Sequence, residues 1–507
     1  MGLKHPPGHE CCRRCFSSRT CISWPSALRM LPAMTDQQLS ETAAAPRLET
    51  SAPSEGEGLR RRLSQRQLTM MAIGGAIGVG LFLGSGVTLR LAGPAVILSY
   101  LLGAVIALIM SYVIAEMAVV HPFAGAFGVY AEKYLNPWAG FSVRATYGVA
   151  QIIAIGAEVT AAGIYISFWF PSVPQWIWVV LVSTILVSVN SMQVNRLGEL
   201  EYWFAMIKVT AIVAFIAVGL YLLFGRGSHG TTGWTNLTKH GGFLPAGWKG
   251  VWLSLTITIT SYMGVEIIAV TAGEAERPDV TIPRAMRNIV WRLILFYVLA
   301  VAIMVSMVPW DQSIKSSGLS GSPFVAAFSA AHVPFAAAIM HFVVLTAALS
   351  SVNTNLYLST RMLFSLGREG YGPDWMGKVS RNGVPHRALL ASTAGIAAAI
   401  LLAVFAPKNA FLTLYGTAVA GMFFVWLVIL NSHLCFRRAI ARDRLLSLPM
   451  RLRAHPIFTV AGIVLLVAIS MTTFFVDGLQ WSVPAFSAFL GFITLLYFRN
   501  HASKIAG

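Results

Sequence analysis

Five ionisable residues stand out within or at the end of apolar stretches that are long enough to cross a membrane, and four of them could exchange protons. They are Lys208, Glu158, Glu266 and Glu274. A charged side chain at the centre of a membrane-spanning helix costs about 2.5–3.5 kcal/mol on insertion scales, so each needs a compensating role. An amine or a carboxylate that meets the two sides of a membrane in turn can release and regain a proton. These residues are therefore candidates for proton exchange across a membrane.

Each of these residues also has a second interpretation. Lys208 could extend its amine to the cytoplasmic interface from a span that begins near Tyr202. Glu266 could be structural, accepting hydrogen bonds from backbone amides beside a helix break. Glu158 could line a substrate site or relay protons, and Glu274 lies where a cytoplasmic gate is expected.

Other polar side chains in apolar stretches have weaker patterns. We interpret Arg144 as an interfacial anchor. Asn353 and Asn355 could face a cavity or join helices by hydrogen bonds, and both alternatives stay open. The histidines have no metal-ligand spacing, so we predict no metal site and interpret them as interfacial or packing residues. They are His121, His332, His341 and His433.

Glycine clusters predict two interrupted helices. Gly74, Gly75, Gly78 and Gly80 fall within seven residues, a density that should unwind a helix locally. The sequence Ser261-Tyr262-Met263-Gly264-Val265-Glu266 places a glycine and a carboxylate in one turn of a later span. Irregular backbone at membrane depth is tolerated only where it is buried in protein or lines a cavity. Paired half-helix ends suit an amino acid zwitterion, because their amides attract its carboxylate and their carbonyls accept from its ammonium. Close helix packing alone is the alternative.

The composition requires a membrane protein around these residues. Of 507 residues, 56% are hydrophobic and 11% are charged, and the mean hydropathy is +0.68. An ordinary soluble domain is excluded. The net charge of +17 is concentrated on one side of the predicted spans, so we expect no nucleic-acid partner.

Twelve apolar stretches of roughly 18 to 25 residues are long enough to cross a bilayer. The predicted fold is an all-α integral membrane protein with 12 transmembrane helices, in which the interrupted first and sixth spans are equivalent positions of a 5+5 inverted repeat. The predicted spans begin near Leu68, Gly93, Trp138, Trp176, Tyr202, Val251, Trp291, Pro323, Arg387, Phe411, Pro456 and Trp481.

Arginines between the spans predict the topology. Those in the N-terminal segment, in the even-numbered connections and near the C-terminus mark the cytoplasmic side, so both termini should be inside and the protein multi-pass in the bacterial inner membrane. Residues 1–59 lack apolar periodicity and are predicted to be a disordered cytoplasmic segment, with Met34 as a candidate true start. Residues 60–500 form the predicted transport domain, and residues 501–507 form a short cytoplasmic tail.

Six ordered segments carry a resemblance to a known family. They are the first-span glycine segment, Ala92-Gly93-Pro94 with Glu116 and Pro122, Gly264-Val265-Glu266, Gly273-Glu274-Ala275-Glu276-Arg277-Pro278, Ile282-Pro283-Arg284-Ala285, and Ser359-Thr360-Arg361-Met362-Leu363-Phe364. From about residue 59 to the C-terminus the chain resembles the amino acid/polyamine/organocation permeases. The bacterial branch that it resembles includes D-alanine/glycine, GABA, proline, lysine and aromatic permeases.

The resemblance implies a LeuT-like fold in which spans one and six bind the substrate backbone and spans three, eight and ten complete the pocket. Backbone groups near Ala76, Gly78, Val79 and Gly80 would hold the carboxylate and part of the ammonium, and carbonyls near Thr260 and Met263 would complete the ammonium site. The position of Val79 is often Ser or Thr in the family, so this chain would depend on backbone amides there or prefer a different substrate geometry.

Further roles follow from the same resemblance. Gly264 would leave room for the substrate side chain, which Asn355 would face. Lys208 matches a lysine that occupies the place of a sodium ion in relatives that use protons. Ser261 and Thr260 beside Gly264 suggest a small or medium neutral side chain, while Glu158 keeps a cationic substrate open.

The remaining alternatives concern mechanism and class. No phosphate-binding loop, zinc-binding His-Glu-x-x-His or Gly-x-Ser-x-Gly motif is present in the sequence, so we expect neither an enzyme nor ATP-driven transport. We expect no cofactor beyond the coupling proton, and an amino acid and membrane lipid as partners. Exchange, import of a cationic amino acid, GABA or proline, and a transport-inactive sensor remain alternatives. Neither the oligomeric state nor a preference for L or D substrates follows from the sequence.

Overall fold

The computed structural model describes most of the chain from residue 65 onward. The described ranges are 65–82, 84–122, 125–192, 194–224, 233–271, 278–312, 322–330, 335–380, 383–405 and 410–506. The chain divides into two compact units, Met1–Gly56 and Glu57–Gly507, and every described residue belongs to the second. The predictions for residues 1–59, including a start at Met34, lie outside the described residues.

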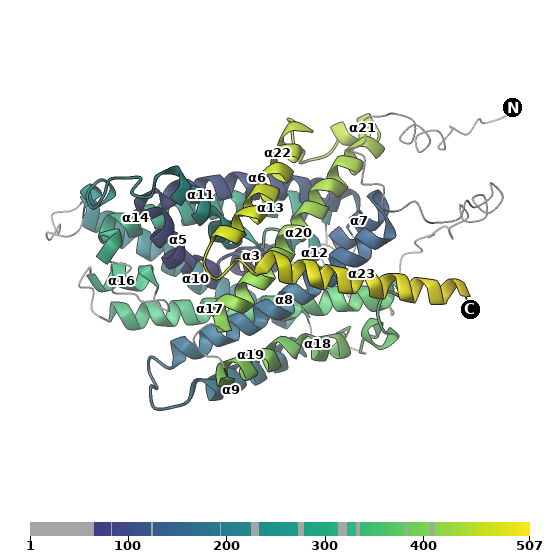
Figure 1. Cartoon of the computed structure of the whole chain (residues 1–507), viewed down its shortest axis with the longest axis horizontal. Helices are drawn as coiled ribbons and strands as arrows, with labels where there is room; N and C mark the ends of the chain where they lie inside the picture. Colours follow the sequence, from purple (N-terminus) through teal and green to yellow (C-terminus); the bar gives the residue numbers. More distant parts are fainter. Residues whose placement is uncertain are drawn as a thin grey trace. The chain divides into compact units, whose positions relative to one another are not determined.

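The described residues form helices and no strand (Figure 1). Their all-helical content is what the apolar stretches predicted. The α-helices are α3 Gln65–Ala76, α4 Val79–Phe82, α5 Gly84–Ala92, α6 Val96–Val120, α7 Ala126–Tyr134, α8 Pro137–Ile166, α9 Gln175–Asn190, α10 Val194–Phe224, α11 Gly247–Thr258, α12 Ile267–Thr271, α13 Pro278–Ile294, α14 Ala300–Met307, α16 Pro323–Ala330, α17 Ala336–Arg368, α18 His386–Ser392, α19 Ala394–Phe405, α20 Ala410–Ala439, α21 Arg442–Leu446, α22 Ile457–Thr472 and α23 Ser482–Ala506.

Eight helical stretches in the described part of the chain are long and apolar enough to cross a membrane. Three shorter apolar helices accompany them, at Gln175–Asn190, Leu295–Met307 and His386–Leu401. Each predicted span start lies in a helix or next to one, but the count of 12 spans and the inverted repeat remain predictions. The eight stretches are Gly80–Val120, Pro137–Ile166, Arg196–Phe224, Gly247–Val270, Ala338–Arg368, Gly416–Ala439, Ile457–Phe475 and Ser482–Arg499.

Two helices are interrupted where the glycines predicted. α3 ends at Ala76 and α4 begins at Val79, with a bend at residues 77 and 78. α11 passes into a 3-10 helix, η3 Ile259–Tyr262, and a turn then separates η3 from α12. Gly264 in that turn has φ of +118°, a backbone conformation that L side chains rarely adopt. The sequence prediction of both breaks is confirmed.

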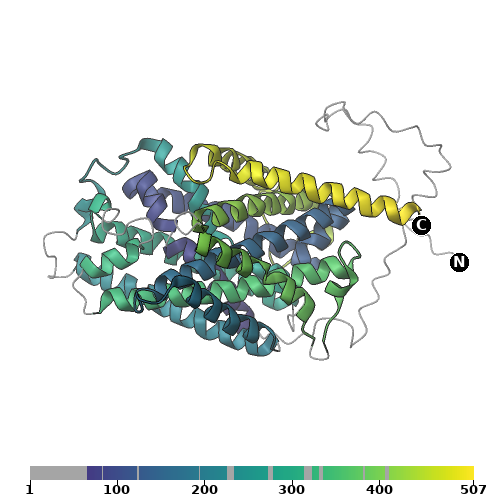
Figure 2. The ribbon, with the colours of Figure 1, turned by 60° about the horizontal axis from the view of Figure 1, so that its bottom comes forward.

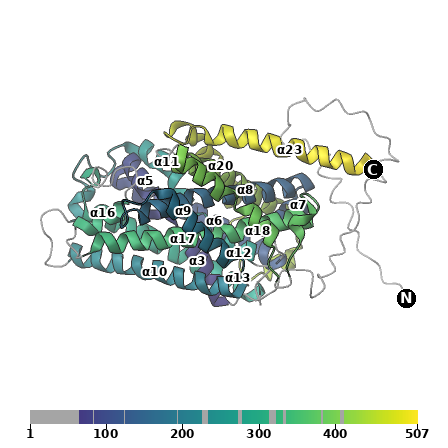
Figure 3. The ribbon, with the colours of Figure 1, turned by 90° about the horizontal axis from the view of Figure 1, so that it is seen from below.

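α8 is the central support of the two breaks. It begins with Asn136, whose side chain accepts a hydrogen bond from the amide of Ala139 at 2.8 Å, followed by Pro137 in the first turn, where its missing N–H costs nothing. α17 and α20 both pack against α8, and α3 packs against α10 (Figures 1 and 3). These contacts bring α3, α8, α10, α17 and α20 together around the interrupted segments.

α23 lies on the outside of this helical unit, along one side of it (Figure 2). Large apolar side chains on it are exposed, including Phe492, Leu495 and Phe498. Such a surface suits contact with lipid tails. The helix continues to Ala506 and so includes most of residues 501–507, the predicted tail.

Candidate functional site

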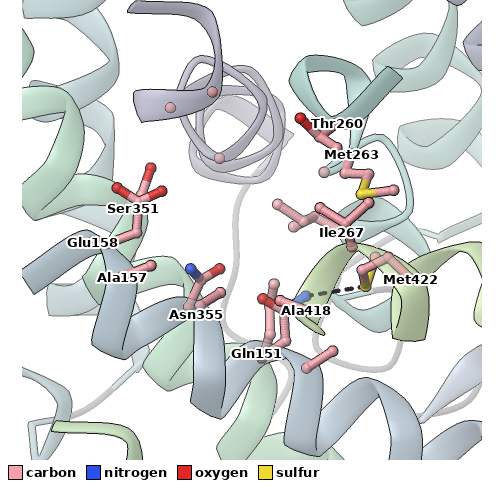
Figure 4. A pocket seen from close by; sticks show the side chains of 18 of the residues that line it. Gln151, Ala157, Glu158, Thr260, Met263, Ile267, Ser351, Asn355, Ala418 and Met422 are labelled. Carbon is pink, nitrogen blue, oxygen red and sulfur yellow. Dashed lines mark hydrogen bonds between the residues drawn. The ribbon is translucent and has the colours of Figure 1, made fainter. Parts of the chain in front are cut away.

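A cavity of about 110 Å³ lies where the two interrupted helices meet α8, α17 and α20 (Figure 4). That volume can hold several water molecules or a small organic molecule. The first break contributes glycine backbone to it, and the second contributes both backbone and side chains. Its lining consists of Gly75, Gly78, Gly80, Ala150, Gln151, Ala154, Ala157, Glu158, Thr260, Ser261, Met263, Gly264, Glu266, Ile267, Ser351, Asn355, Leu358, Ala418, Val419 and Met422.

Most of the residues that the sequence singled out line this cavity. Those proposed for substrate are Gly78, Gly80, Thr260, Ser261, Met263, Gly264 and Asn355, and those proposed for protons are Glu158 and Glu266.

Four of the predicted site residues are not in the lining. Ala76 ends α3 and Val79 begins α4, on either side of the first bend, so both flank the cavity wall in the chain. Lys208 lies on α10, behind the first break. Glu274 lies outside the described residues. The substrate and proton roles of all these residues remain predictions.

Lys208 holds the first break from behind. Its amine donates to the carbonyl of Gly74, to the carbonyl of Ile77 at 2.9 Å and to the hydroxyl of Ser350 at 2.9 Å. The last carbonyls of a helix lack partners within it and carry partial negative charge, so a cation at this end of α3 is favourable. The Lys208 side chain is fully buried, so the alternative that it extends to the interface is wrong.

Glu201 is a buried carboxylate that sequence reasoning missed. It accepts from the hydroxyl of Ser350 at 2.7 Å and from the amide of Asn353. The same Ser350 hydroxyl accepts from Lys208, so one hydroxyl links the amine to the carboxylate. The signal was present, because Glu201 precedes Lys208 by seven residues and therefore shares its helix face. The predicted start of the fifth span near Tyr202 excluded Glu201 by one residue, whereas α10 begins at Val194.

The two asparagines of α17 have different environments. Asn353 is buried and joins helices, donating to Glu201 and accepting from Asn190 at 2.6 Å. Asn355 lines the cavity instead. Both alternatives of the sequence prediction therefore apply, one to each residue.

Glu158 reaches the cavity from α8 with incomplete pairing. Its Oε2 atom is buried and has no hydrogen-bond partner among the described residues. Its Oε1 atom lies 3.8 Å from the point where a Cβ on Gly78 would stand, so this carboxylate faces the first break. A buried, unpaired carboxylate oxygen is costly unless it is protonated or meets a ligand.

Glu266 supports the second break. Its Oε2 atom accepts from the backbone amide of Gly264 at 3.0 Å, and its Oε1 atom accepts from the hydroxyl of Tyr147 at 3.4 Å. The unwound turn is thereby tied to α8 as well as to its own chain. This geometry favours the structural interpretation of Glu266, although its carboxylate also lines the cavity.

Two glycines permit the close approach of helices at the first break. A Cβ on Gly75 would stand 2.3 Å from Cδ1 of Ile267, and a Cβ on Gly78 would stand 2.7 Å from Oγ of Ser351. Contacts this short require a displacement. The glycine-rich sequence therefore brings the first break against α12 and α17, as well as loosening the helix.

A second buried charge cluster lies apart from the cavity lining. Glu116 on α6 accepts from His433 at 2.9 Å, from Arg437 at 2.6 Å and from the backbone amide of Leu452. His433 also contacts the hydroxyl of Thr459 at 3.2 Å, so it belongs to a buried polar network rather than to an interface. Burial, with His433 and Arg437 nearby, lowers the pKa of His455 to about 4, so His455 adds no charge near neutral pH.

Arg144 corrects another sequence prediction. Its side chain is buried, donating to Glu132 at 2.7 Å and to Ser365 at 3.1 Å. The interpretation as an interfacial anchor is wrong, because partners on α7 and α17 satisfy the guanidinium inside the protein.

Among the described residues, no group of three or more His, Cys, Asp or Glu side chains is placed to hold a metal ion.

Comparisons with known proteins agree with this architecture. A family model described as amino acid permease matches residues 67–502. The amino acid permease YtnA of Bacillus subtilis is 40% identical over 400 residues, which cover 78% of this chain and 86% of the relative. The gamma-aminobutyric acid permease of Bacillus subtilis is 36% identical over 451 residues, or 89% of this chain and 95% of that protein. The aromatic amino acid transport protein AroP of Salmonella typhimurium is 38% identical over 384 residues, or 76% and 83%.

These relatives are transporters and not enzymes, and bacterial permeases with several apolar helices are multi-pass proteins of the inner membrane. The family model spans most of the chain, and the relatives align over most of their own lengths. The chain therefore belongs to the amino acid permease family.

Proposed function

We propose that this permease imports a small or medium neutral amino acid together with protons, by alternating access of a central site to the two sides of the membrane. The observation that carries the proposal is the cavity between the two helix breaks, with Glu158 in its wall and Lys208 directly behind it. The cavity places backbone groups of both breaks beside ionisable side chains, which suits a zwitterion and a coupling proton.

The substrate backbone is proposed to bind at the breaks. Amides at the start of α4, near Gly80, receive the carboxylate, and carbonyls near Thr260 and Met263 accept from the ammonium. Because Val79 offers no hydroxyl, backbone amides carry the carboxylate interaction. Gly264 leaves room for the substrate side chain.

Proton coupling is proposed to depend on Lys208 and Glu158. The amine of Lys208 replaces a bound cation by holding the carbonyls of Gly74 and Ile77. Loss of its proton would remove the positive charge and one of the three N–H donors, which weakens the hold on those carbonyls and loosens the first break, so protonation and the conformation of the substrate site become linked. Glu158, with one unpaired oxygen in the cavity wall, is proposed as the group through which the proton passes.

The overall topology belongs to the same proposal. Twelve spans with a LeuT-like inverted repeat would place both termini in the cytoplasm, together with Arg437 and Arg438 in the last turn of α20 and Arg442 just after it. The relatives transport chemically different substrates, among them gamma-aminobutyric acid and aromatic amino acids, so their names do not decide the substrate of this chain.

A second candidate is import of a cationic amino acid. The unpaired oxygen of Glu158 favours it, because a carboxylate in the cavity wall could pair with a substrate ammonium or guanidinium. Under this alternative Glu158 recognises the side chain and does not carry protons.

The test is uptake of a panel of labelled amino acids, with GABA and proline, into proteoliposomes with and without an inward proton gradient. Stimulation of neutral amino acid uptake by the gradient, abolished by an uncoupler, is the expected result. Uptake of Lys or Arg alone would select the cationic alternative. Equal one-for-one exchange without a gradient effect would show an exchanger, and absence of uptake by verified folded protein would favour a sensor.

A further inference from the structure

The cavity has a wall that the sequence prediction did not include. Gln151 on α8 and Ala418 and Met422 on α20 lie together in this wall (Figure 4), and Val419 on α20 also lines it. We propose that Gln151 determines substrate specificity by hydrogen bonding to the substrate side chain, and that it selects amino acids bearing a hydroxyl or carboxamide over aliphatic ones of the same size. This inference rests on the proposed function and narrows its substrate class.

The hydrogen bonding of Gln151 is weak on the cavity side. Its side chain is 7% exposed, and its Nε2 atom points to the sulfur of Met422 at 3.9 Å, the contact drawn dashed in Figure 4. A thioether sulfur is a poor acceptor. A buried amide with such a partner gains when a substrate oxygen replaces the sulfur.

Met422 is suited to give way. A methionine side chain has three rotatable bonds and no branch, so it can move aside with little strain when a ligand enters. The Met422 sulfur therefore serves as a substitute partner for the Gln151 amide while the site is empty. The side chains of neighbouring Ala418 and Val419 cannot form hydrogen bonds. Among these four lining residues, Gln151 is therefore the one that can hydrogen-bond well to a polar group of the substrate.

The residue one helical turn before Gln151 on α8 is connected to the second break. Tyr147 donates to Glu266 at 3.4 Å, and Glu266 accepts from the amide of Gly264. Gln151 therefore lies on the part of α8 that is tied to the turn proposed to hold the substrate backbone.

Of the other polar groups in the cavity lining, Thr260 and Glu266 already have hydrogen-bond partners, while the hydroxyls of Ser261 and Ser351 also line the cavity. The hydroxyl of Thr260 donates to the carbonyl of Ile257 at 2.6 Å, and Glu266 is occupied by Gly264. Glu158 is assigned to the proton. Asn355, on α17, which packs against α8, contributes a second amide to the lining. Two amides offer both donors and acceptors without net charge, which matches a hydroxyl or a carboxamide.

The expected discrimination is moderate. An aliphatic substrate leaves the Gln151 amide with its weak sulfur partner and loses one hydrogen bond to a buried group, which corresponds to a preference on the order of 10-fold to 100-fold. Threonine against valine and serine against alanine test this preference with little change in volume.

The experiment measures initial uptake of labelled Thr, Val, Ser and Ala into proteoliposomes under one fixed proton gradient. The variants are Gln151→Leu, which removes the amide at similar volume, and Met422→Leu, which removes the sulfur and keeps the amide. Gln151→Met provides a second, flexible replacement should Gln151→Leu fail to fold.

The wild type and Met422→Leu should prefer Thr over Val by 10-fold or more, on the order given above, and Gln151→Leu should bring the ratio close to 1 while Val uptake persists. A wild type that transports Val as well as Thr overturns the inference and leaves the proposed function intact, as does a Thr preference that survives in both Gln151 variants. Absence of gradient-driven uptake of any amino acid by the folded wild type overturns both.

Discussion

Two buried clusters of charge in this permease differ in how completely their carboxylates are paired. Glu116 receives hydrogen bonds from His433, Arg437 and the backbone of Leu452, and all three lie at the junction of α6, α20 and the segment before α22. Glu158, in the cavity wall, has an oxygen with no hydrogen-bond partner among the described residues. The Glu116 carboxylate therefore has hydrogen-bond donors on both oxygens, whereas the Glu158 carboxylate does not.

The difference indicates different tasks. A buried carboxylate with three donors is stabilised as an anion and resists any change of protonation, so the Glu116 cluster serves to fasten helices together. A carboxylate with an empty acceptor position can gain a proton or a ligand without breaking a bond. The cluster at the first break combines that carboxylate with Lys208, whose amine is bonded to backbone carbonyls that a transport cycle has to rearrange.

The largest effect is expected for Lys208→Met. The substitution should abolish gradient-driven accumulation, because the carbonyls of Gly74 and Ile77 and the hydroxyl of Ser350 lose their common donor and no proton can leave at this position. The measurement is uptake against a concentration gradient in proteoliposomes, after size-exclusion chromatography has established folding. Lys249→Met, at an exposed position on α11, is the matched control. Full pH-dependent accumulation in Lys208→Met would refute the coupling role.

Glu158→Gln should reduce transport less and should not reduce stability. The neutral amide cannot exchange a proton, so the stimulation of uptake by a proton gradient should disappear while counterflow exchange continues. Because the substitution removes a carboxylate with an unpaired buried oxygen, the melting temperature in detergent should stay level or rise. A normal response to the gradient in Glu158→Gln would leave this carboxylate without a part in coupling and strengthen the cationic-substrate alternative.

Glu116→Gln should show the opposite combination. Arg437 and His433 lose their anionic partner inside the protein, and breaking a buried pair in this way costs about 3–5 kcal/mol. The melting temperature should therefore fall, while the pH dependence of uptake by the remaining folded protein stays that of the wild type. Glu199→Gln is the control, since its ion pair with Arg66 is largely exposed and such pairs contribute about 0–1 kcal/mol. An unchanged melting temperature for Glu116→Gln would remove the structural role.

Features encoded locally could be predicted from the sequence. The apolar stretches identified the helices, and the glycine density at 74–80 and the Gly264–Glu266 pair located both breaks. Seven of the nine residues proposed for substrate line the cavity because those breaks are themselves its wall.

Features that depend on tertiary packing could not be predicted. In the sequence, Arg144 has the pattern of an interfacial anchor. Its burial follows from hydrogen bonds to Glu132 and Ser365, which only the folded structure brings next to it. Gln151 and Met422 have no local pattern, since an amide and a thioether on long helices are ordinary packing residues unless other helices leave a cavity in front of them. Glu201 is an intermediate case. Its spacing from Lys208 could be recognised in the sequence, but its burial depends on packing against α17.

The smallest effect is expected for Glu266→Gln, which tests whether the second break requires the negative charge of Glu266 or only its hydrogen-bond acceptors. A glutamine oxygen can still accept from the amide of Gly264 and from the hydroxyl of Tyr147, so the unwound turn should persist without the negative charge. Uptake should keep the pH profile of the wild type, measured as initial rates from pH 5 to 8 in proteoliposomes, and Glu266→Leu, which cannot accept, should lose uptake. If Glu266→Gln changes the pH profile as Glu158→Gln is expected to do, both carboxylates take part in proton transfer. The distinction between a hydrogen-bonded structural carboxylate and an unpaired transport carboxylate then no longer holds within the cavity.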